Sequence, residues 1–289
     1  MRIDINTKFI TLIGTPLAQS FAARMQNTAY DAMGQNLRYF YTEADETHLG
    51  EIMAGVRYMP SFAGCAITKP NKVRVLEYLD RLDPLCEKMG ACNTVVKTPE
   101  GELVGYNTDG AGFYISLTEE AGLRPEEYTF FCIGAGGAGR AICSELAYHG
   151  AKKIYIADLF EDCSTWLTDD INRVFAPVAE KVPYGDYSCV PECSVVINAS
   201  GIGMGNTMGQ SPLPEEYIRP EQFYFDACYN PDKTQFLLNA EAKGCRVMNG
   251  LGMSLYQGAA QIELWTGQKP PVDVMRRELM DILEEASGN

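Results

Sequence analysis

Histidine and long apolar runs are both scarce in this sequence. Its 289 residues include two histidines, His48 and His149, which are too few to favour a histidine-based metal site or acid–base pair. Proton transfer near neutral pH therefore falls to lysine, aspartate, glutamate or tyrosine. No run approaches the ~18 consecutive apolar residues of a membrane span. The first residues lack the charged, apolar and cleavage regions that are typical of a signal peptide. We expect a soluble, cytoplasmic protein without a metal.

Positive charge is also in short supply. The chain has 24 lysines and arginines against 38 aspartates and glutamates, which gives a net charge of −14. A nucleic-acid backbone or an anionic membrane surface would be repelled overall, so neither is expected as a partner. Apolar residues make up 46% of the sequence, a globular composition long enough for two domains.

Ten cysteines are scattered along the chain, most of them within apolar runs. Such placement is typical of reduced thiols packed in a core. One close pair, Cys189 and Cys193, has no second pair to complete a tetrahedral zinc site. We interpret the cysteines as structural.

Strand-like and helix-like segments alternate along the first part of the chain. An apolar, β-branched run at 9–13 ends at a Gly-Thr-Pro turn, and a segment of helical composition follows from 20 to 33. Further strands are expected at 37–41, 64–68, 93–97 and 103–106, and helices at 45–56, 70–80, after Asp83-Pro84, and at 108–121. This order predicts an α/β domain with a largely parallel sheet.

A glycine-rich loop follows the predicted strand 128–133 and opens a helix. A second strand, 153–157, ends at Asp158, 24 residues after Gly134. This context favours a dinucleotide-binding βαβ unit. Gly134 would allow the tight turn, Gly136 the approach of the backbone to a pyrophosphate, and Gly139 close packing of helix and strand. The alternative is a loop that serves only as a turn. The loop reads Gly134-Ala135-Gly136-Gly137-Ala138-Gly139.

Asp158 indicates which dinucleotide is expected. Its carboxylate can accept hydrogen bonds from both hydroxyls of an adenosine ribose, but it would repel a 2′-phosphate. The next four residues, 159–162, offer no lysine or arginine to hold such a phosphate. We therefore predict a preference for NAD, with NADP as the lesser alternative. The structural alternative is that Asp158 only caps the helix that follows.

Several short runs occur along the chain in an order typical of one enzyme family. The series resembles the shikimate dehydrogenases, and especially the branch that acts on shikimate and quinate. The resemblance covers nearly the whole chain, so it is far more specific than the glycine loop alone. The runs are Gly14–Ser20, Ile67–Lys72, Gly90–Thr94, Gly105–Gly110, Gly134–Gly139, Asn198–Ser200, Gly250–Met253 and Gln257–Ala259.

The resemblance implies a fold and a reaction. It implies an amino-terminal α/β substrate domain at 1–110, a Rossmann domain with a doubly wound parallel sheet at 111–245, and carboxy-terminal helices at 246–289 that return to the first domain. The active site would lie in the cleft between the domains. The implied reaction is the reversible oxidation of a ring alcohol by NAD(P), as in the chorismate pathway to aromatic amino acids. The implied partners are a small cyclic hydroxy acid and, in a homodimer, a second copy of the chain.

Lys72 and Asp109 fall on the catalytic positions of the family. Chemistry agrees with this assignment, because reduction of a ketone develops alkoxide character that an ammonium can stabilise and protonate. A neighbouring carboxylate would hold the amine in place. The alternative is a surface lysine and a helix-capping aspartate.

The resemblance also assigns binding roles. Substrate contacts fall to Ser20, Tyr39, Thr68, Asn93, Tyr229 and Gln257. Cofactor contacts fall to Gly134, Ala135, Gly136, Gly137, Ala138, Gly139, Asp158, Ser200, Gly203, Met204 and Gly250. For the two tyrosines the alternative is a role in packing only, and for Gln257 it is a polar position on a helix face.

The chain departs from the family pattern at two positions. Family members usually carry Ser-x-Ser-Pro in the first loop, whereas this sequence has Ala22 and Ala23 after Ser20-Phe21. Ala66 stands where biosynthetic members often have asparagine. Each lost group would cost roughly 1–3 kcal/mol if a shikimate-like acid were held in the same pose. Either Arg24 or a water compensates, or the substrate differs.

Three functions stay open at this point. The first is a shikimate or quinate dehydrogenase. The second is a paralogue that acts on a different cyclic hydroxy or amino acid related to shikimate, which activity on a substrate without the carboxylate would reveal. The third is a sensor that binds NAD without turnover, and the presence of both Lys72 and Asp109 argues against it.

Overall fold

The computed structural model describes residues 3–18 and 20–287, and the chain divides into two compact units. The first unit comprises the chain through Thr108 together with the residues from Leu255 onward. The second unit runs from Asp109 to Ser254. The second unit therefore extends beyond the expected range 111–245 at both ends.

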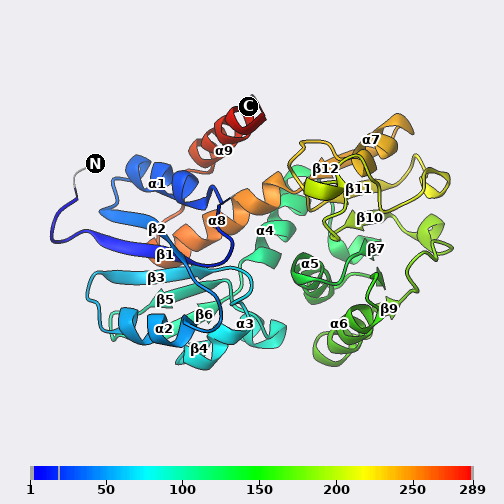
Figure 1. Cartoon of the computed structure of the whole chain (residues 1–289). Helices are drawn as coiled ribbons and strands as arrows, with labels where there is room; N and C mark the ends of the chain where they lie inside the picture. Colours follow the sequence, from blue (N-terminus) through cyan, green and yellow to red (C-terminus); the bar gives the residue numbers. More distant parts are fainter. Residues whose placement is uncertain (1–2, 19, 288–289) are drawn as a thin grey trace. The chain divides into compact units, whose positions relative to one another are not determined.

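A mixed sheet with the strand order β2-β1-β3-β5-β6-β4 forms the first unit (Figure 1). Strand β1 runs parallel to β2 and β3, whereas β5 runs antiparallel to β3 and β6. The sheet is thus less parallel than predicted, because β5 and β6 are joined by a turn too short for a parallel crossover. The strands are β1 (Lys8–Gly14), β2 (Leu37–Glu43), β3 (Phe62–Ile67), β4 (Arg81–Leu82), β5 (Thr94–Lys97) and β6 (Leu103–Tyr106).

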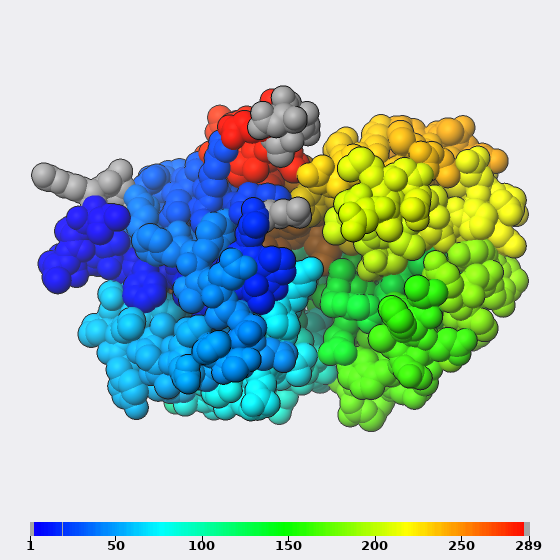
Figure 2. Space-filling model, viewed as in Figure 1, coloured from blue at the N-terminus to red at the C-terminus, as the bar shows by residue number. Residues whose placement is uncertain are grey.

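Helices from both ends of the chain cover this sheet. Helix α1 (Ala22–Ala32, blue) packs against α9 (Val272–Ser287, red), as Figures 1 and 2 show. The short helix expected after Asp83 is present as α3 (Pro84–Met89), and the Asp83 carboxylate accepts a hydrogen bond from the Leu85 N–H at 3.0 Å. The remaining helices are α2 (Leu49–Arg57) and α8 (Leu251–Thr266), which continues into the first unit from the second.

The prediction of a helix at 70–80 is wrong, because this segment forms a 3₁₀ turn, η1 (Arg74–Tyr78), in place of an α-helix. The Lys72 carbonyl accepts a hydrogen bond from the Cys92 N–H at 2.8 Å. The Asn71 side chain donates to the Ala44 carbonyl at 2.9 Å. The backbone carbonyl of Lys72, which an α-helix would pair with an N–H of its own next turn, therefore bonds to a distant loop, and the Asn71 side chain ties the turn to a second one.

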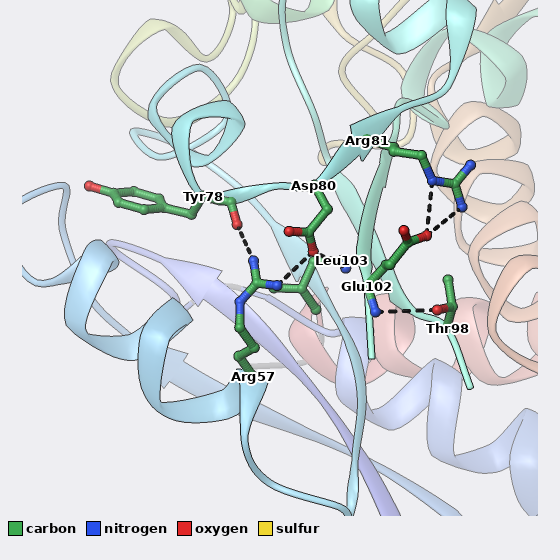
Figure 3. A network of polar contacts seen from close by, with 7 residues as sticks. All are labelled: Arg57, Tyr78, Asp80, Arg81, Thr98, Glu102 and Leu103. Carbon is green, nitrogen blue, oxygen red and sulfur yellow. Dashed lines mark hydrogen bonds and ion pairs between the residues drawn. The ribbon is translucent and has the colours of Figure 1, made fainter. Parts of the chain in front are cut away.

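An ion pair and a hydrogen bond from Arg57 tie α2 to the segment that leads into β4 (Figure 3). Arg57 donates to the Asp80 carboxylate at 2.6 Å and to the Tyr78 carbonyl at 3.0 Å. Asp80 also accepts the Leu103 N–H at 2.7 Å, and the Arg57 guanidinium holds the pKa of Asp80 below its usual value. Side chains thus hold the two-residue strand β4 beside β6 in addition to its own backbone pairing.

The second unit has a fully parallel sheet with the order β12-β11-β10-β7-β8-β9. The order reverses at β7, as in a doubly wound Rossmann sheet, so the predicted fold is confirmed. The central strands are β7 (Thr129–Ile133), β8 (Lys153–Ala157), β10 (Val195–Asn198) and β11 (Phe223–Asp226), and the edges are β9 (Ala179–Lys181) and β12 (Arg246–Asn249). Its helices are α4 (Asp109–Ile115), α5 (Gly137–Tyr148), α6 (Glu161–Val174) and α7 (Gln235–Ala242).

Strand β12 was expected to belong to the carboxy-terminal return. It pairs in parallel with β11 instead, with Phe223 opposite Arg246 and Asp226 opposite Asn249. Pairing with β11 makes this short, half-polar segment a strand, and the helical return to the first unit begins at Leu255. In residues 3–18 and 20–287, no helix combines the length and apolar character needed to cross a membrane.

Candidate active site

Asn93 lies at the centre of a buried polar cluster in the first unit. Its Oδ1 accepts hydrogen bonds from the Thr108 N–H and the Thr94 hydroxyl, both at 2.8 Å. Its Nδ2 donates to Thr108 Oγ1 at 3.0 Å and to Gln257 Oε1 at 3.5 Å. The structure therefore brings two predicted substrate residues, Asn93 and Gln257, within hydrogen-bonding reach of each other. Because Oδ1 is fully occupied, the Asn93 amide group is fixed with its donor toward Gln257.

Two glutamines that the sequence did not single out support this cluster. Gln261 Nε2 donates to Thr94 Oγ1 at 3.0 Å, and Gln26 Nε2 donates to Gln261 Oε1 at 3.3 Å. Gln261 lies one helical turn after Gln257 on α8, so the spacing of the two glutamines was an available signal. A weaker signal was available for Gln26, which is a polar residue on the buried face of α1.

Thr68 and Lys72 belong to the turn that follows β3. The Thr68 N–H donates to the Ile13 carbonyl at 2.9 Å, which places Thr68 at the carboxyl edge of the parallel strands β1 and β3. The Lys72 carbonyl accepts the N–H of Cys92, the residue before Asn93. Thr68, Lys72 and Asn93 thus gather at one edge of the first sheet, where α/β folds commonly bind ligands.

Tyr41 holds the loop that begins at Ser20. Its hydroxyl donates to the Ser20 carbonyl at 2.6 Å and accepts the Ala23 N–H at 3.0 Å. The Ser20 Oγ accepts the Ala22 N–H at 3.4 Å. Tyr41 was not predicted, and no local pattern marks it. Gln19, which is part of the first family-like run, lies outside the described residues.

Arg24, which follows this loop in the sequence, pairs with helix α9. Its guanidinium pairs with Glu278 and, at 2.9 Å, with Glu285 on α9. These two carboxylates hold the pKa of Arg24 above its usual value. Two carboxylates on α9 thus hold the Arg24 guanidinium, and its compensation for the missing hydroxyl stays a prediction.

Tyr39 is packed in the core of the first unit. Its ring meets Trp265 edge-on, with centroids 6.1 Å apart, and only 2% of the residue is exposed. The hydroxyl has no hydrogen-bond partner among the residues that the structure describes, and burial raises its pKa. A role of Tyr39 in the substrate pocket stays a prediction.

The glycine loop joins β7 to α5 in the second unit. Gly134 has a φ of +109°, which favours glycine, and a Cβ on Gly139 would overlap the Gly134 carbonyl oxygen. A Cβ on Gly136 or Gly137 would meet nothing within 4 Å. Helix α5 begins here without a side-chain cap in the described part of the chain, so its first N–H groups point to an open surface. The loop fits the pyrophosphate of a dinucleotide.

Asp158 closes the loop from the end of β8. One carboxylate oxygen accepts the Ala135 N–H at 2.6 Å and the other accepts the Phe160 N–H at 2.8 Å. A cavity of about 310 Å³ lies beside it, and no lysine or arginine is among the described residues that line it. Exposed apolar side chains, Leu159 and Phe160, suit a nucleobase, and the carboxylate suits ribose hydroxyls. The cavity also includes Gly134, Gly136 and Ser200.

Asn198, at the end of β10, holds the loop that carries Ser200 and Gly203. Its Oδ1 accepts the Ser200 N–H at 3.1 Å, and its Nδ2 donates to the Ile202 carbonyl at 2.8 Å. The amide also donates to Asp226 at 3.0 Å. This loop follows β10, which pairs with β7 at the point where the strand order reverses, so it lies on the same edge as the glycine loop. Met204 in this loop is half-exposed.

Asp226, at the end of β11, was not predicted as a site residue. It accepts hydrogen bonds from the Thr234 hydroxyl at 2.5 Å and the Cys228 N–H at 2.9 Å. Burial raises the pKa of Asp226, and these donors oppose the shift. Asp226 thereby shapes the segment that includes Tyr229, whose own pKa burial raises. The position of Asp226 at the carboxyl end of a parallel strand was the feature that could have marked it as a site residue.

The remaining predicted residues lie at the starts of helices. Asp109 is the first residue of α4 and follows Thr108, which bonds to Asn93. Gly250 precedes α8, and a Cβ there would overlap the Ala227 carbonyl oxygen. Ala138 lies in the first turn of α5. Within the described ranges, no three His, Cys, Asp or Glu side chains gather as a metal site.

Two family profiles match the chain. One is described as the shikimate dehydrogenase substrate binding domain and matches residues 12–95. The other, the shikimate 5′-dehydrogenase C-terminal domain, matches residues 250–280.

Curated and solved relatives extend the match to the whole chain. The NADP(+) shikimate dehydrogenase of Moorella thermoacetica is 38% identical over 100% of this chain and 98% of its own. The Listeria monocytogenes shikimate 5-dehydrogenase in complex with shikimate and NAD has a TM-score of 0.92 and 35% identity, covering 96% of this chain and 98% of its own. The ligand-free 5-ketofructose reductase of Gluconobacter sp. has a TM-score of 0.88 and 30% identity, covering 96% and 100%. The chain therefore belongs to the shikimate dehydrogenase family and is an NAD(P)-dependent oxidoreductase.

Proposed function

We propose that the protein interconverts shikimate and 3-dehydroshikimate, quinate and 3-dehydroquinate, or both pairs. The observation that carries this proposal is the set of polar groups at one edge of the first sheet, where Asn93 lies beside Gln257, and Thr68 and Lys72 follow β3. Such a set can bind several hydroxyls of one ring and present an ammonium to one of them. The relatives named shikimate dehydrogenase support the choice of ring.

Lys72 and Asp109 are proposed to handle the proton. In the reduction direction the Lys72 ammonium stabilises the negative charge that grows on the ketone oxygen and gives that oxygen a proton. In the oxidation direction the neutral amine accepts the hydroxyl proton. Asp109 would hold the ammonium in place, and Asn93 and Gln257 would orient the ring. The nicotinamide cofactor, when bound, gives or takes the hydride.

NAD is proposed as the preferred cofactor. The pyrophosphate would lie on the loop Gly134–Gly139, and Asp158 would accept the hydroxyls of the adenosine ribose. Ser200, Gly203, Met204 and Gly250 would border the nicotinamide. The Moorella relative is named for NADP(+) and the Listeria structure holds NAD, so the preference rests on Asp158 and on the lack of lysine or arginine among the described residues of its cavity.

Asp158→Ala should lower the ratio of kcat/KM with NAD to kcat/KM with NADP by about tenfold or more. The expected reason is loss of the ribose contacts and of the repulsion toward a 2′-phosphate, together worth about 1–3 kcal/mol. Because Asp158 also accepts the N–H groups of Ala135 and Phe160, Asp158→Asn serves as the partner variant that removes the charge and keeps an acceptor. Unchanged discrimination in both variants would remove Asp158 from cofactor choice.

A ketone without a carboxylate is the second candidate substrate. The loop from Ser20 to Ala23 has one side-chain hydroxyl, and Arg24 is paired with α9. The Gluconobacter relative acts, by its name, on such a substrate. A cyclic or linear polyol ketone would need no anion-binding group in this loop.

The test is the change in nicotinamide absorbance with purified protein. NAD and NADP are each paired with shikimate, with quinate and with a carboxylate-free polyol or its ketone. Turnover of either acid supports the proposal. Turnover of the carboxylate-free compound alone would establish the second candidate. Binding of NAD without turnover of any substrate would favour a sensor.

The cellular setting is proposed from the cysteines. All ten are free and most are buried, which suits the reducing cytoplasm. Assembly into a homodimer stays a prediction that a sedimentation measurement would decide.

A further inference from the structure

The carboxy-terminal end of α5 packs against α4 in the second unit, where two residues, four positions apart in each segment, face one another. Glu145 lies in the last turn of α5, and His149, four positions later, is the residue that follows this helix. Gly110 and Tyr114 lie one turn apart on α4. A Cβ on Gly110 would lie 2.6 Å from Glu145 Oε2. The His149 ring stacks on the Tyr114 ring, with centroids 3.6 Å apart and planes 9° apart. We call these four residues the α4–α5 clasp.

The carboxyl group of Glu145 is the buried element of this clasp. The residue is 3% exposed, and Oε1 lies 3.2 Å from His149 Nε2. Oε2, which faces Gly110, has no hydrogen-bond partner in the described part of the chain. Burial raises the pKa of Glu145 to about 7 and lowers the pKa of His149. Both directions favour a neutral pair, in which the protonated carboxyl donates to Nε2.

A carboxylate lies near each end of the clasp, Asp109 toward Gly110 and Glu126 toward His149. Helix α4 begins with the Asp109 carboxylate, next to Gly110. Burial lowers the pKa of His149, and Glu126, in the 3₁₀ turn Pro125–Glu127, partly offsets that lowering. Arg140 lies earlier on α5, but its guanidinium stacks over the Trp166 ring at 3.8 Å. An ionised Glu145 would therefore add a second carboxylate, next to that of Asp109, at the start of α4.

We propose that Glu145 is a positioning residue for Asp109. In its protonated form it lets the first turn of α4 pack against α5, and in its ionised form it loosens the turn that carries Asp109. The inference rests on the proposed role of Asp109 in proton transfer. The inference extends that role, because the placement of the Asp109 carboxylate on α4 would then depend on the carboxyl group of Glu145 on α5.

The kinetic test uses Glu145→Gln, which keeps the size of the side chain and its donor but cannot ionise. The ratio of kcat in this variant to kcat in the wild type is measured from about pH 6 to about pH 8, on either side of the pKa of about 7. We expect a ratio near one at the acid end and a several-fold rise at the alkaline end, with KM changing less than kcat. Tyr114→Phe, which keeps the stacked ring, should follow the wild-type profile. A purely structural role would give a ratio that does not vary with pH, and that result would overturn the proposal.

A second test does not need turnover. Hydrogen exchange of the backbone amides from 110 to 115 is compared between wild type and Glu145→Gln over the same pH range, after correction for intrinsic exchange. We expect faster exchange at the alkaline end in the wild type alone. Equal exchange in the two proteins would contradict the proposal. If the wild type turns over no ring acid, the proposed function fails, and this measurement still decides the role of Glu145.

Discussion

Lys72→Ala should lower kcat for a ring substrate by about 10²–10⁴-fold, the usual contribution of a positioned general acid or base. The loss arises because no other ammonium is proposed to meet the oxygen that gains charge. Lys72 shares one edge of the first sheet with Thr68 and Asn93, whereas the proposed cofactor residues lie in the second unit. Binding of NAD, measured by fluorescence or calorimetry, should therefore stay unchanged in the variant.

Lys69 provides a matched control for this substitution. It lies in the same turn but is exposed, and its backbone carbonyl accepts the Thr15 N–H at 3.0 Å. Lys69→Ala should leave kcat within about twofold of the wild type, as expected for an exposed side chain outside special contacts. Similar losses in the two variants would mean that the turn as a whole matters, and they would remove the specific proton role from Lys72.

Gly139→Ala should destabilise the second unit by about 3 kcal/mol or more. The added Cβ would overlap the carbonyl oxygen of Gly134, and it would lie 2.8 Å from the carbonyl carbon. These are backbone atoms in the turn between β7 and α5, so relief requires the helix to move away from the loop. Chemical denaturation followed by circular dichroism measures the loss, and the affinity for NAD should fall with it.

Gly137→Ala separates packing from contact with the cofactor. Gly137 is the first residue of the same helix, and a Cβ there meets nothing within 4 Å. The Gly137→Ala variant should match the wild type in stability or slightly exceed it, since alanine is a better helix former than glycine. If NAD binding weakens in this variant while stability holds, the new methyl group obstructs the surface where the pyrophosphate is proposed to lie. Equal stability of the Gly137 and Gly139 variants would contradict the packing argument.

The βαβ unit could be predicted from the sequence because its signals are local. Strand β7, the loop Gly134–Gly139, helix α5 and strand β8 follow one another without interruption, ending at Asp158. Each step depends on nearby residues: apolar runs for the strands, glycines for the turn, and an acidic residue at the next strand end. The structure has these elements within a few residues of their expected bounds.

The segment 70–80 shows why a local pattern can mislead. Its composition suits a helix, yet the Lys72 carbonyl accepts a hydrogen bond from Cys92, 20 residues later in the chain. The same holds for Arg24, whose carboxylate partners lie on α9 at the other end of the sequence. Hydrogen bonds between distant segments outweighed the local preference in the first case and set the direction of the side chain in the second.

The fold class, the family, the cofactor loop and the residue types available for proton transfer could be predicted from the amino-acid sequence, because they depend on short runs and their order. Only the tertiary structure brought Asn93 to Gln257, 164 positions away, and placed Gln261 and Gln26 behind them. It also placed Glu145 and His149 against Gly110 and Tyr114. Such contacts arise from the packing of one helix on a sheet or on another helix, and the periodicity within either segment does not specify which residues of the partner they meet.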